Sequence, residues 1–456
     1  MTHAHSAPLR QNERIQFIDS VRGVALLGIL LMNITAQSQA HFFYDKLDLR
    51  QSLTGLNFYA WGAEMFFFEG TMRGLFSILF GAGTILLLSR LVKKMHGLEP
   101  ADIYYRRLLW LLVFGLINAF IFLWPGDILY PYALCGLLLF PFRNLSPKKL
   151  LWIAFAILVI GTYRENSDLF KYKKTISQGQ VAEALEAKKL TLTDKQKEQL
   201  DAYKGFKERA SGQGIVKRAE KEEKEIKGQS YLAIFRYYRD INMRLQSQDM
   251  YENGVWDILL CFFIGMALYK SGFLLGKKSN ALYASVAVAG ISLGMVINYF
   301  YLRQQYQLKF DVFQLVQKLK FSYYEIRRVS QTLGYLSLLI LLYKITPFKK
   351  IMHVFAPVGQ MAFTNYLTQS IFTSIIFYGV GLFATLQRYE IYYIVAAIWL
   401  FQIVTSHIWL RYFRFGPFEW VWRSLTYMKK QPMKRLAATS ETEEVPVELT
   451  PTPALA

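Results

Sequence analysis

The chain is poor in cysteine and in charge for its length. Of its 456 residues only Cys135 and Cys261 are cysteines, and both lie inside apolar runs. This excludes a disulfide scaffold and multi-cysteine zinc or iron–sulfur sites, and we expect no metal site. Charged residues make up 19% of the chain, whereas hydrophobic residues make up 53%. An ordinary soluble chain is about 45–50% apolar even with glycine counted, so the composition indicates a membrane protein.

Several enzyme motifs are also missing. The sequence has no G-x-S-x-G, no H-E-x-x-H and no P-loop, which argues against an ATP-driven pump encoded in this chain. No clear repeat relates its two halves, and this weakens the case for a transporter without excluding it.

The positive charge is unevenly spread. The net charge is +20, from 53 basic and 33 acidic residues. The stretch 164–253 holds 19 basic and 15 acidic residues, so the other 366 residues carry only 34 basic and 18 acidic ones. Sparse, basic-biased charge is typical of cytoplasmic loops between membrane helices. We therefore expect the lipid bilayer, and not nucleic acid, as the partner.

Apolar runs predict an all-α fold, a polytopic membrane helix bundle of about ten transmembrane helices. The chain then divides into an N-terminal transmembrane half (1–163), a charged extracytoplasmic insert (164–253), a C-terminal transmembrane half (254–436) and a disordered tail (437–456). The runs lie at 23–34, 71–92, 104–123, 127–142, 149–163, 254–273, 280–302, 330–346, 360–383 and 389–412.

Basic residues in the short loops predict the orientation. The positive-inside rule places both termini in the cytoplasm, because the turn Pro125-Gly126-Asp127 on the other side has no basic residue. One segment, 303–329, is basic yet would lie outside, which a surface amphipathic helix or a miscounted span would explain. The basic inside segments are 90–107, 143–149, 270–278, 344–350 and 411–435.

The insert is predicted to form charged helices outside the membrane. Thr193 to Gln196 fits a capping box, and two charged helices are expected at 195–209 and 215–227. Their faces are nearly all polar, which favours a solvated excursion over a lid or a partner platform.

Polar groups within membrane helices cost roughly 2.5–3.5 kcal/mol each, so they are candidates for function. Asp19 and Arg22 lie three apart at the start of the first helix and can pair, either as a helix cap or as an anchor for a phosphate-bearing ligand. Asn33, deeper in the run, suits an interhelical hydrogen bond. His41 follows the outer end of this helix, where it is either a solvated residue or a general base.

Two acid–arginine pairs at helical spacing are expected to neutralise each other. Glu69 and Arg73 lie four apart at the start of the second run, and Glu419 and Arg423 have the same spacing after a Gly-Pro turn.

Four further polar residues suit a bundle interior or a substrate path. Asn118 lies in the third run, and Asp127 suits an N-cap or an acid facing a cavity. Asn365 and Gln369 lie four apart and share one helix face.

Six segments together resemble the YeiB-type family of bacterial inner-membrane proteins, a domain-of-unknown-function family often described as transporters. The resemblance covers most of the chain apart from the insert and tail. The segments are FIDSVRGVALLGILLMNI, FFFEGTMRGLFSILFGAG, YYRRLLWLLVFGLINAF, GDILYPYALCG, PVGQMAFTNYLTQSIF and FGPFEWVWRSLTY.

The opening Asp-x-x-Arg-Gly is also distantly similar to the membrane acyltransferase superfamily, including the heparan glucosaminide acetyltransferases. This resemblance implies that Arg22, Arg106 and Arg107 bind the phosphates of acyl-CoA, a co-substrate rather than a bound cofactor. It implies His41 as base or transient acyl carrier. Asn33 and Asn118 stand where related proteins have histidine, so the shared chemistry cannot use those positions here.

Three functions follow. The first is acyl transfer from cytoplasmic acyl-CoA to an extracytoplasmic hydroxyl or amine on a glycan or lipid-linked acceptor. The second is transport of a small or amphipathic molecule along the polar stripe at Asn365 and Gln369. The third is a structural or regulatory role exerted through the insert.

Overall fold

The computed structural model describes residues 15–435, so the predicted disorder of the tail lies outside the described residues. Within them the chain is helical and has no β-strand beyond one isolated bridge between Phe413 and Lys434. This confirms the all-α fold.

The N-terminal part leads into one very long helix, α6, of 41 residues. The helices before the insert are α1 (Gln16–Ser38), α2 (Leu56–Ala63), α3 (Thr71–Lys94), α4 (Glu99–Leu116), α5 (Leu129–Leu137) and α6 (Pro147–Ala187). Those of the insert are α7 (Asp194–Ala210), α8 (Gly212–Ile226) and α9 (Tyr231–Arg244). Those after it are α10 (Val255–Lys270), α11 (Asn280–Gln307), α12 (Val312–Lys318), α13 (Tyr324–Tyr343), α14 (Thr346–Gln360), α15 (Ala362–Ser374), α16 (Arg388–Tyr412) and α17 (Pro417–Thr426).

Short π-helical and 3-10 segments continue several of these helices. The π-helical segments are η3 (Glu64–Phe68), η4 (Ile117–Ile121), η6 (Leu245–Gly254) and η7 (Ile375–Gly379), and the 3-10 segments are η2 (His41–Phe43) and η5 (Phe140–Asn144).

Fewer helices than expected are both long enough and apolar enough to cross a membrane. Among residues 15–435, six meet the length and composition of a span, and α13 with α14, which bend by 114° at their junction, would make a seventh. The difference from ten arises because some apolar runs fold into shorter helices. The run 127–142, for example, contains α5, which at nine residues cannot cross a bilayer.

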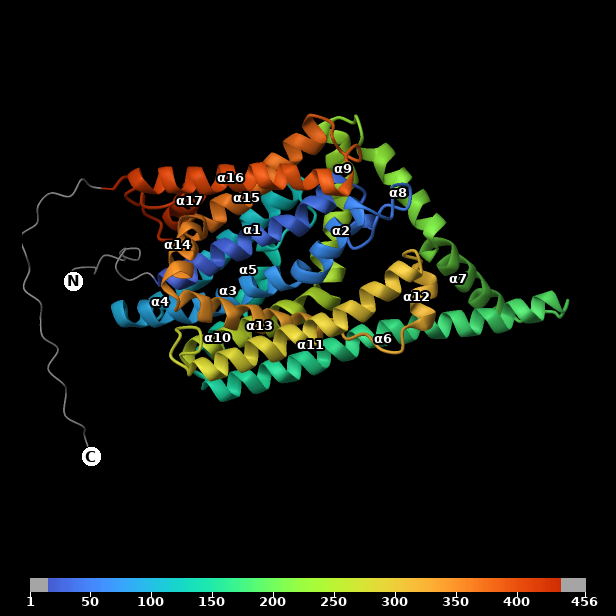
Figure 1. Cartoon of the computed structure of the whole chain (residues 1–456), viewed down its shortest axis with the longest axis horizontal. Helices are drawn as coiled ribbons and strands as arrows, with labels where there is room; N and C mark the ends of the chain where they lie inside the picture. The colour runs from blue at the N-terminus through green and yellow to red at the C-terminus, as the bar shows by residue number, and fades with distance from the viewer. Residues whose placement is uncertain (1–14, 436–456) are drawn as a thin grey trace, which may run out of the picture.

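The long helices run along one axis and define two ends of the bundle (Figure 1). We call the end near Gln16, Lys94, Lys270 and Tyr412 the basic end, because the basic loops gather there. The opposite end, near Ser38, is the insert end.

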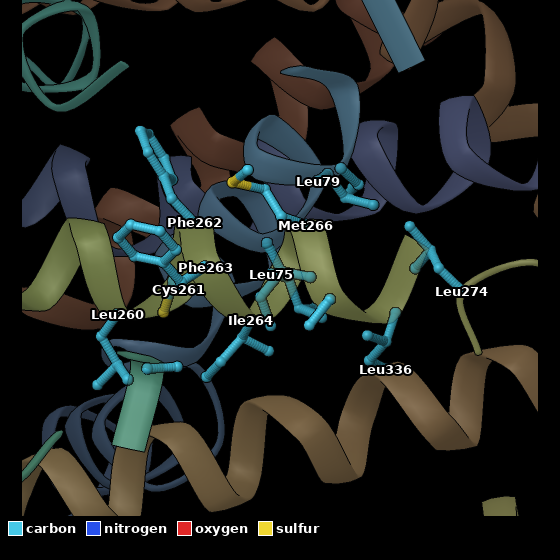
Figure 2. Packing of buried hydrophobic residues seen from close by; sticks show 14 of the residues in the cluster. Leu75, Leu79, Leu260, Cys261, Phe262, Phe263, Ile264, Met266, Leu274 and Leu336 are labelled. Carbon is cyan, nitrogen blue, oxygen red and sulfur yellow. The ribbon is translucent and has the colours of Figure 1, made fainter. Parts of the chain in front are cut away.

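Helix α10 forms the centre of the largest core, with side chains packed all around it (Figure 2). It crosses α3 at very short range: a Cβ on Gly81 would lie 2.2 Å from the Phe262 carbonyl oxygen, and one on Gly265 would lie 2.0 Å from that of Ile78. Glycine is therefore required at both positions for the two helices to approach this closely.

The insert has an outer and an inner part. The far half of α6 extends beyond the bundle and packs with α7 and α12 around a small core that includes Tyr203 and Phe313 (Figure 1). The seven-residue α12 lies in the basic segment 303–329 and is too short to be a span.

The inner part, α8 and α9, docks on the bundle. Ile215 and Ala219 of α8 bury against Ala40 and Phe43. The boundary at 163 falls inside α6, and residues 231–270 form one apolar helical stretch across the boundary at 253. Continuous helix therefore joins the insert to the bundle on both sides.

Candidate functional site

A cavity of about 260 Å³ lies between α1, α3, α4, α15 and α17, at the basic end. Its interior wall is apolar and aromatic, and includes Phe80, Leu111, Tyr132 and Phe363. Four arginines also line it: Arg22, Arg90, Arg107 and Arg423.

All six segments that carry the family resemblance contribute to this one cavity. In chain order they supply Arg22, then Phe76, Leu79, Phe80 and Gly83, then Tyr104, Arg107, Leu108 and Leu111, then Leu129 and Tyr132, then Gly359, Gln360, Ala362, Phe363 and Tyr366, and finally Glu419, Trp422, Arg423 and Tyr427. Residues as far apart in sequence as Arg22 and Tyr427 are thus brought together around it.

The Asp-x-x-Arg-Gly segment is positioned by α14. A Cβ on Gly23 would lie 2.1 Å from the Phe355 carbonyl oxygen, and one on Gly359 would lie 1.8 Å from that of Asp19. This close crossing fixes the first turns of α1, where Arg22 donates to Asp19 across 3.0 Å, as the spacing predicted. Arg22 therefore reaches the cavity from a rigid position.

The two neighbouring arginines of α4 face different surroundings. Arg107 lines the cavity and stacks on the Trp422 ring with 3.6 Å between its guanidinium carbon and the ring centroid. Among the described residues no carboxylate forms an ion pair with it. Arg106 instead pairs with Asp102 and donates to the Thr426 carbonyl oxygen at 3.1 Å, and it does not line the cavity.

Glu419 caps α15 and does not pair with Arg423 as the spacing suggested. Its carboxylate accepts hydrogen bonds from the backbone N–H groups of Phe363 (2.7 Å) and Thr364 (3.0 Å) and from the Thr364 hydroxyl (2.5 Å). The free amides at a helix start attract an acid more strongly than a side chain one turn away. Arg423 lies 4.5 Å over the Phe415 ring and lines the cavity.

The cavity lining includes Tyr366, whose hydroxyl is part of a buried polar cluster. This hydroxyl donates to Asp127 Oδ1 at 3.4 Å, and Asn118 Nδ2 donates to the same oxygen at 2.8 Å. Asp127 Oδ2 accepts from the Tyr130 N–H at 2.9 Å, so Asp127 binds the first turn of α5 from one residue before the N-cap position, which is Ile128. Sequence thus predicted Asn118 and Asp127 as polar sites but gave no sign that they meet Tyr366.

The expected pair of Glu69 and Arg73 is wrong. Glu69 pairs with Arg327 of α13, and Arg73 pairs with Asp257 of α10 at 2.5 Å. Helix α3 begins only at Thr71, after Gly70 in the left-handed conformation. Glu69 therefore precedes the helix, and the spacing of helix neighbours does not apply to it.

His41 lies at the insert end, remote from the arginines. Its Nδ1 is 2.8 Å from Glu222 Oε2 of α8, and its backbone N–H donates to the same oxygen at 3.1 Å. The rise of α1 from Arg22 to Ser38 is about 24 Å, so the structure does not bring His41 and Arg22 together. Glu223, the residue after Glu222, pairs with Arg50, and the hydrogen bonds of Arg50 to Asp48 and to Glu223 raise its pKa.

The polar stripe of α15 faces α16. Asn365 Nδ2 donates to the Ser406 hydroxyl at 3.0 Å, and Gln369 Nε2 donates to Gln402 Oε1 at 3.0 Å. Both side chains are buried and do not line the cavity, and Asn33 lies half-buried in α1.

Sequence reasoning missed two buried charge groups at the insert end. Arg388 Nη2 lies 2.6 Å from Glu64 Oε2, and both side chains are almost fully buried. Arg328 pairs with Asp257 and with Glu325. A charged residue inside an apolar stretch, such as Glu64 in WGAEMFFF, is the signal that could have found the first group.

Comparison with known proteins identifies relatives along almost the whole chain. The family model described as a protein of unknown function (DUF418) matches residues 268–429. The uncharacterised protein YxaH of Bacillus subtilis is 31% identical over 94% of this chain and 98% of its own length. The uncharacterised protein YeiB of Escherichia coli is 30% identical over 92% of this chain and 98% of its own length. No solved structure matches the chain. The chain therefore belongs to the YeiB-like DUF418 family.

Proposed function

We propose that this protein is a membrane acyltransferase that binds acyl-CoA in the cavity at the basic end. The observation that supports this best is the meeting of all six family-like segments at one cavity with an apolar wall and four arginines. An acyl-CoA has the matching chemistry, because it joins phosphates to an apolar thioester chain.

The arrangement of the arginines favours phosphate. Guanidinium groups bind phosphate oxygens with two parallel hydrogen bonds, and Arg107 still has its donors available beside the cavity. Whereas Arg22 has Asp19 as a counter-ion, Arg107 has no carboxylate in ion-pair contact among the described residues. A bound phosphate would supply the missing negative charge.

The size of the cavity suggests which part of acyl-CoA it encloses. Pockets that enclose a drug-sized ligand are about 300–1,000 Å³, and this one measures about 260 Å³. It therefore suits the acyl and pantetheine end of the molecule, with the nucleotide at the arginine-lined mouth.

The orientation that we propose follows the loop charges. With the basic end in the cytoplasm of a bacterial inner membrane, acyl-CoA would reach the cavity from the cytoplasm. The acceptor would be a hydroxyl or amine on a glycan or lipid-linked molecule outside. His41, held by Glu222, stays our candidate base for that side.

Ligand binding can be tested by blocking the cavity. A Cβ on Gly83 meets no heavy atom within 4 Å, and Gly83 lines the cavity, so Gly83→Leu should fill it without disturbing packing. Gly62 is equally open but lies outside the cavity, so Gly62→Leu is the matched control.

We expect acetyl-CoA and longer acyl-CoAs to raise the Tm of the purified protein and of Gly62→Leu. A ligand at 100 times its Kd stabilises by about 2.7 kcal/mol. Gly83→Leu should lose the shift, and Arg107→Ala should weaken binding at least tenfold, because a charged hydrogen bond contributes about 1.5–3 kcal/mol. No Tm shift with any acyl-CoA would refute the proposal.

A further inference from the structure

Helix α14 lies across the basic end of the bundle. It follows α13 after a bend of 114°, so it leaves the direction of the long helices and runs across their ends (Figure 1). Helix α13 has 20 residues, a rise of about 30 Å, which matches the hydrocarbon thickness of a bilayer. The junction after α13 therefore suits a membrane surface, and α14 then runs close to the plane of that surface.

The two halves of α14 have different surroundings. The C-terminal half packs into the bundle, where Ala356 is buried and Gly359 lies against α1. The N-terminal half instead exposes apolar side chains: Phe348, Ile351 and Val354 are 44%, 56% and 41% exposed. These three are spaced three residues apart, so they form one row along the helix. An exposed apolar row on a helix that lies across the end of a membrane bundle is typical of an interfacial helix.

Exposed lysines lie beside this row, and we call them the lysine patch. A turn between α10 and α11 contributes two of them next to the start of α14. The Tyr283 hydroxyl accepts from the Lys278 N–H at 3.1 Å, and the Lys344 ammonium lies 4.7 Å from the centre of the Tyr283 ring. The patch consists of Lys277, Lys278, Lys344, Lys349 and Lys350, all exposed.

No carboxylate balances the charge of the lysine patch. The sequence has no Asp or Glu between residues 326 and 389, and none of the five lysines forms an ion pair within residues 15–435. Lys344 donates only to the uncharged Asn280 amide oxygen, at 2.7 Å. Clusters of about four to eight basic residues on an amphipathic helix, or just beyond a membrane span, are typical of sites for anionic lipid headgroups.

We propose that the exposed side of α14 lies in the headgroup layer of the membrane, where the lysine patch binds anionic phospholipids. Phe348, Ile351 and Val354 then enter the boundary between headgroups and acyl chains, while the flexible lysine side chains keep their ammonium groups level with the phosphates. The inference is independent of the proposed acyl-CoA site, because it concerns a different surface and a different ligand.

The headgroup contact can be tested by titrating the detergent-purified full chain with phosphatidylglycerol and following its Tm. Phosphatidylglycerol should stabilise the protein more than phosphatidylcholine with the same acyl chains. The double variant Lys349→Gln with Lys350→Gln should weaken the apparent affinity for phosphatidylglycerol about 25-fold, since each lysine near an anionic surface contributes about fivefold, the equivalent of about 1 kcal/mol. Lys188→Gln with Lys189→Gln, an exposed adjacent pair at the far end of α6, is the matched control and should keep the wild-type affinity.

Two results of this titration would overturn the proposal. One is equal stabilisation by the two lipids, and the other is an unchanged affinity for phosphatidylglycerol in the Lys349 and Lys350 double variant. Inorganic phosphate separates a lipid surface from a site for free anions. It should act equally on the wild-type protein and the double variant, and a phosphate effect that the double variant loses would contradict the lipid assignment.

The position of α14 has a direct test in vesicles. In a chain without Cys135 and Cys261, a fluorophore on Ile351→Cys should be quenched by phospholipids that carry a nitroxide near the headgroup. The same fluorophore on Lys188→Cys should emit as in water and escape quenching. A fluorophore at residue 351 that emits as in water would remove α14 from the membrane surface. Neither test depends on acyl-CoA binding, which the Gly83→Leu comparison decides separately.

Discussion

Arg107 at the basic end differs in its contacts from the buried arginines at the insert end. At the insert end Arg388, Arg327 and Arg328 are buried and each forms an ion pair with a carboxylate. At the basic end Arg107 lies beside a cavity and has no ion-pair partner among the described residues. A buried pair fixes the contact between two helices, whereas Arg107 lies beside the cavity in which we propose that a phosphate binds. The contrast distinguishes the structural role of Arg388, Arg327 and Arg328 from the binding role that we propose for Arg107.

The largest expected effect comes from breaking a pair at the insert end. Arg388→Met should lower the free energy of unfolding by about 3–5 kcal/mol, because it leaves the Glu64 carboxylate buried without its cation. It also removes donors to the carbonyl oxygens of Phe43, Tyr44 and Lys46. Thermal unfolding in detergent measures the loss.

The double variant Glu64→Leu with Arg388→Met is the control for this prediction. It should recover part of the stability, because no charge is then left unpaired. An Arg388→Met protein as stable as the wild type would remove the distinction between the two ends.

A much smaller effect is expected at the basic end. Arg107→Met should change the unfolding free energy without ligand by less than about 1 kcal/mol, since no ion pair within the described chain is lost and the methionine can still pack on Trp422. The same thermal unfolding assay compares it with Arg388→Met. A loss as large as that of Arg388→Met would show that Arg107 is structural.

The third prediction concerns the orientation of the protein in the membrane, and not its stability. Lys148 and Lys188 are exposed and lie at opposite ends of α6, about 60 Å apart by helix rise. In a chain without Cys135 and Cys261, Lys188→Cys should react with an impermeant thiol reagent in intact cells. Lys148→Cys should react only after permeabilisation, and the reverse result would invert the orientation.

The fold class could be read from composition, because only a helix or a closed barrel satisfies its backbone within lipid. The ion-pair partners of the charged residues could not be predicted from the sequence. The Glu64 and Arg388 pair joins residues 324 apart, and no local pattern encodes such a contact. Glu69 was mispaired because Gly70 breaks the helix just where the spacing was applied.

The candidate site was predictable in part. The sequence pointed to Arg22 and Arg107, and both line the cavity. It could not separate Arg107 from Arg106, because neighbours on a helix point about 100° apart and only the packing of α4 decides which one faces inward. Tyr366 was not singled out, since its hydrogen bond to Asp127 joins residues 239 apart in sequence.

The unbroken helices on both sides of the insert have a practical consequence. Helix α6 leads the chain out of the bundle, and the helical stretch 231–270 leads it back into the central core. Neither junction therefore contains a flexible loop about which the insert could rotate. A small rigid protein fused into the turn at 188–193 would keep a fixed orientation relative to the membrane helices (Figure 1). It would give a protein of 53.0 kDa an external marker for aligning its images by electron microscopy.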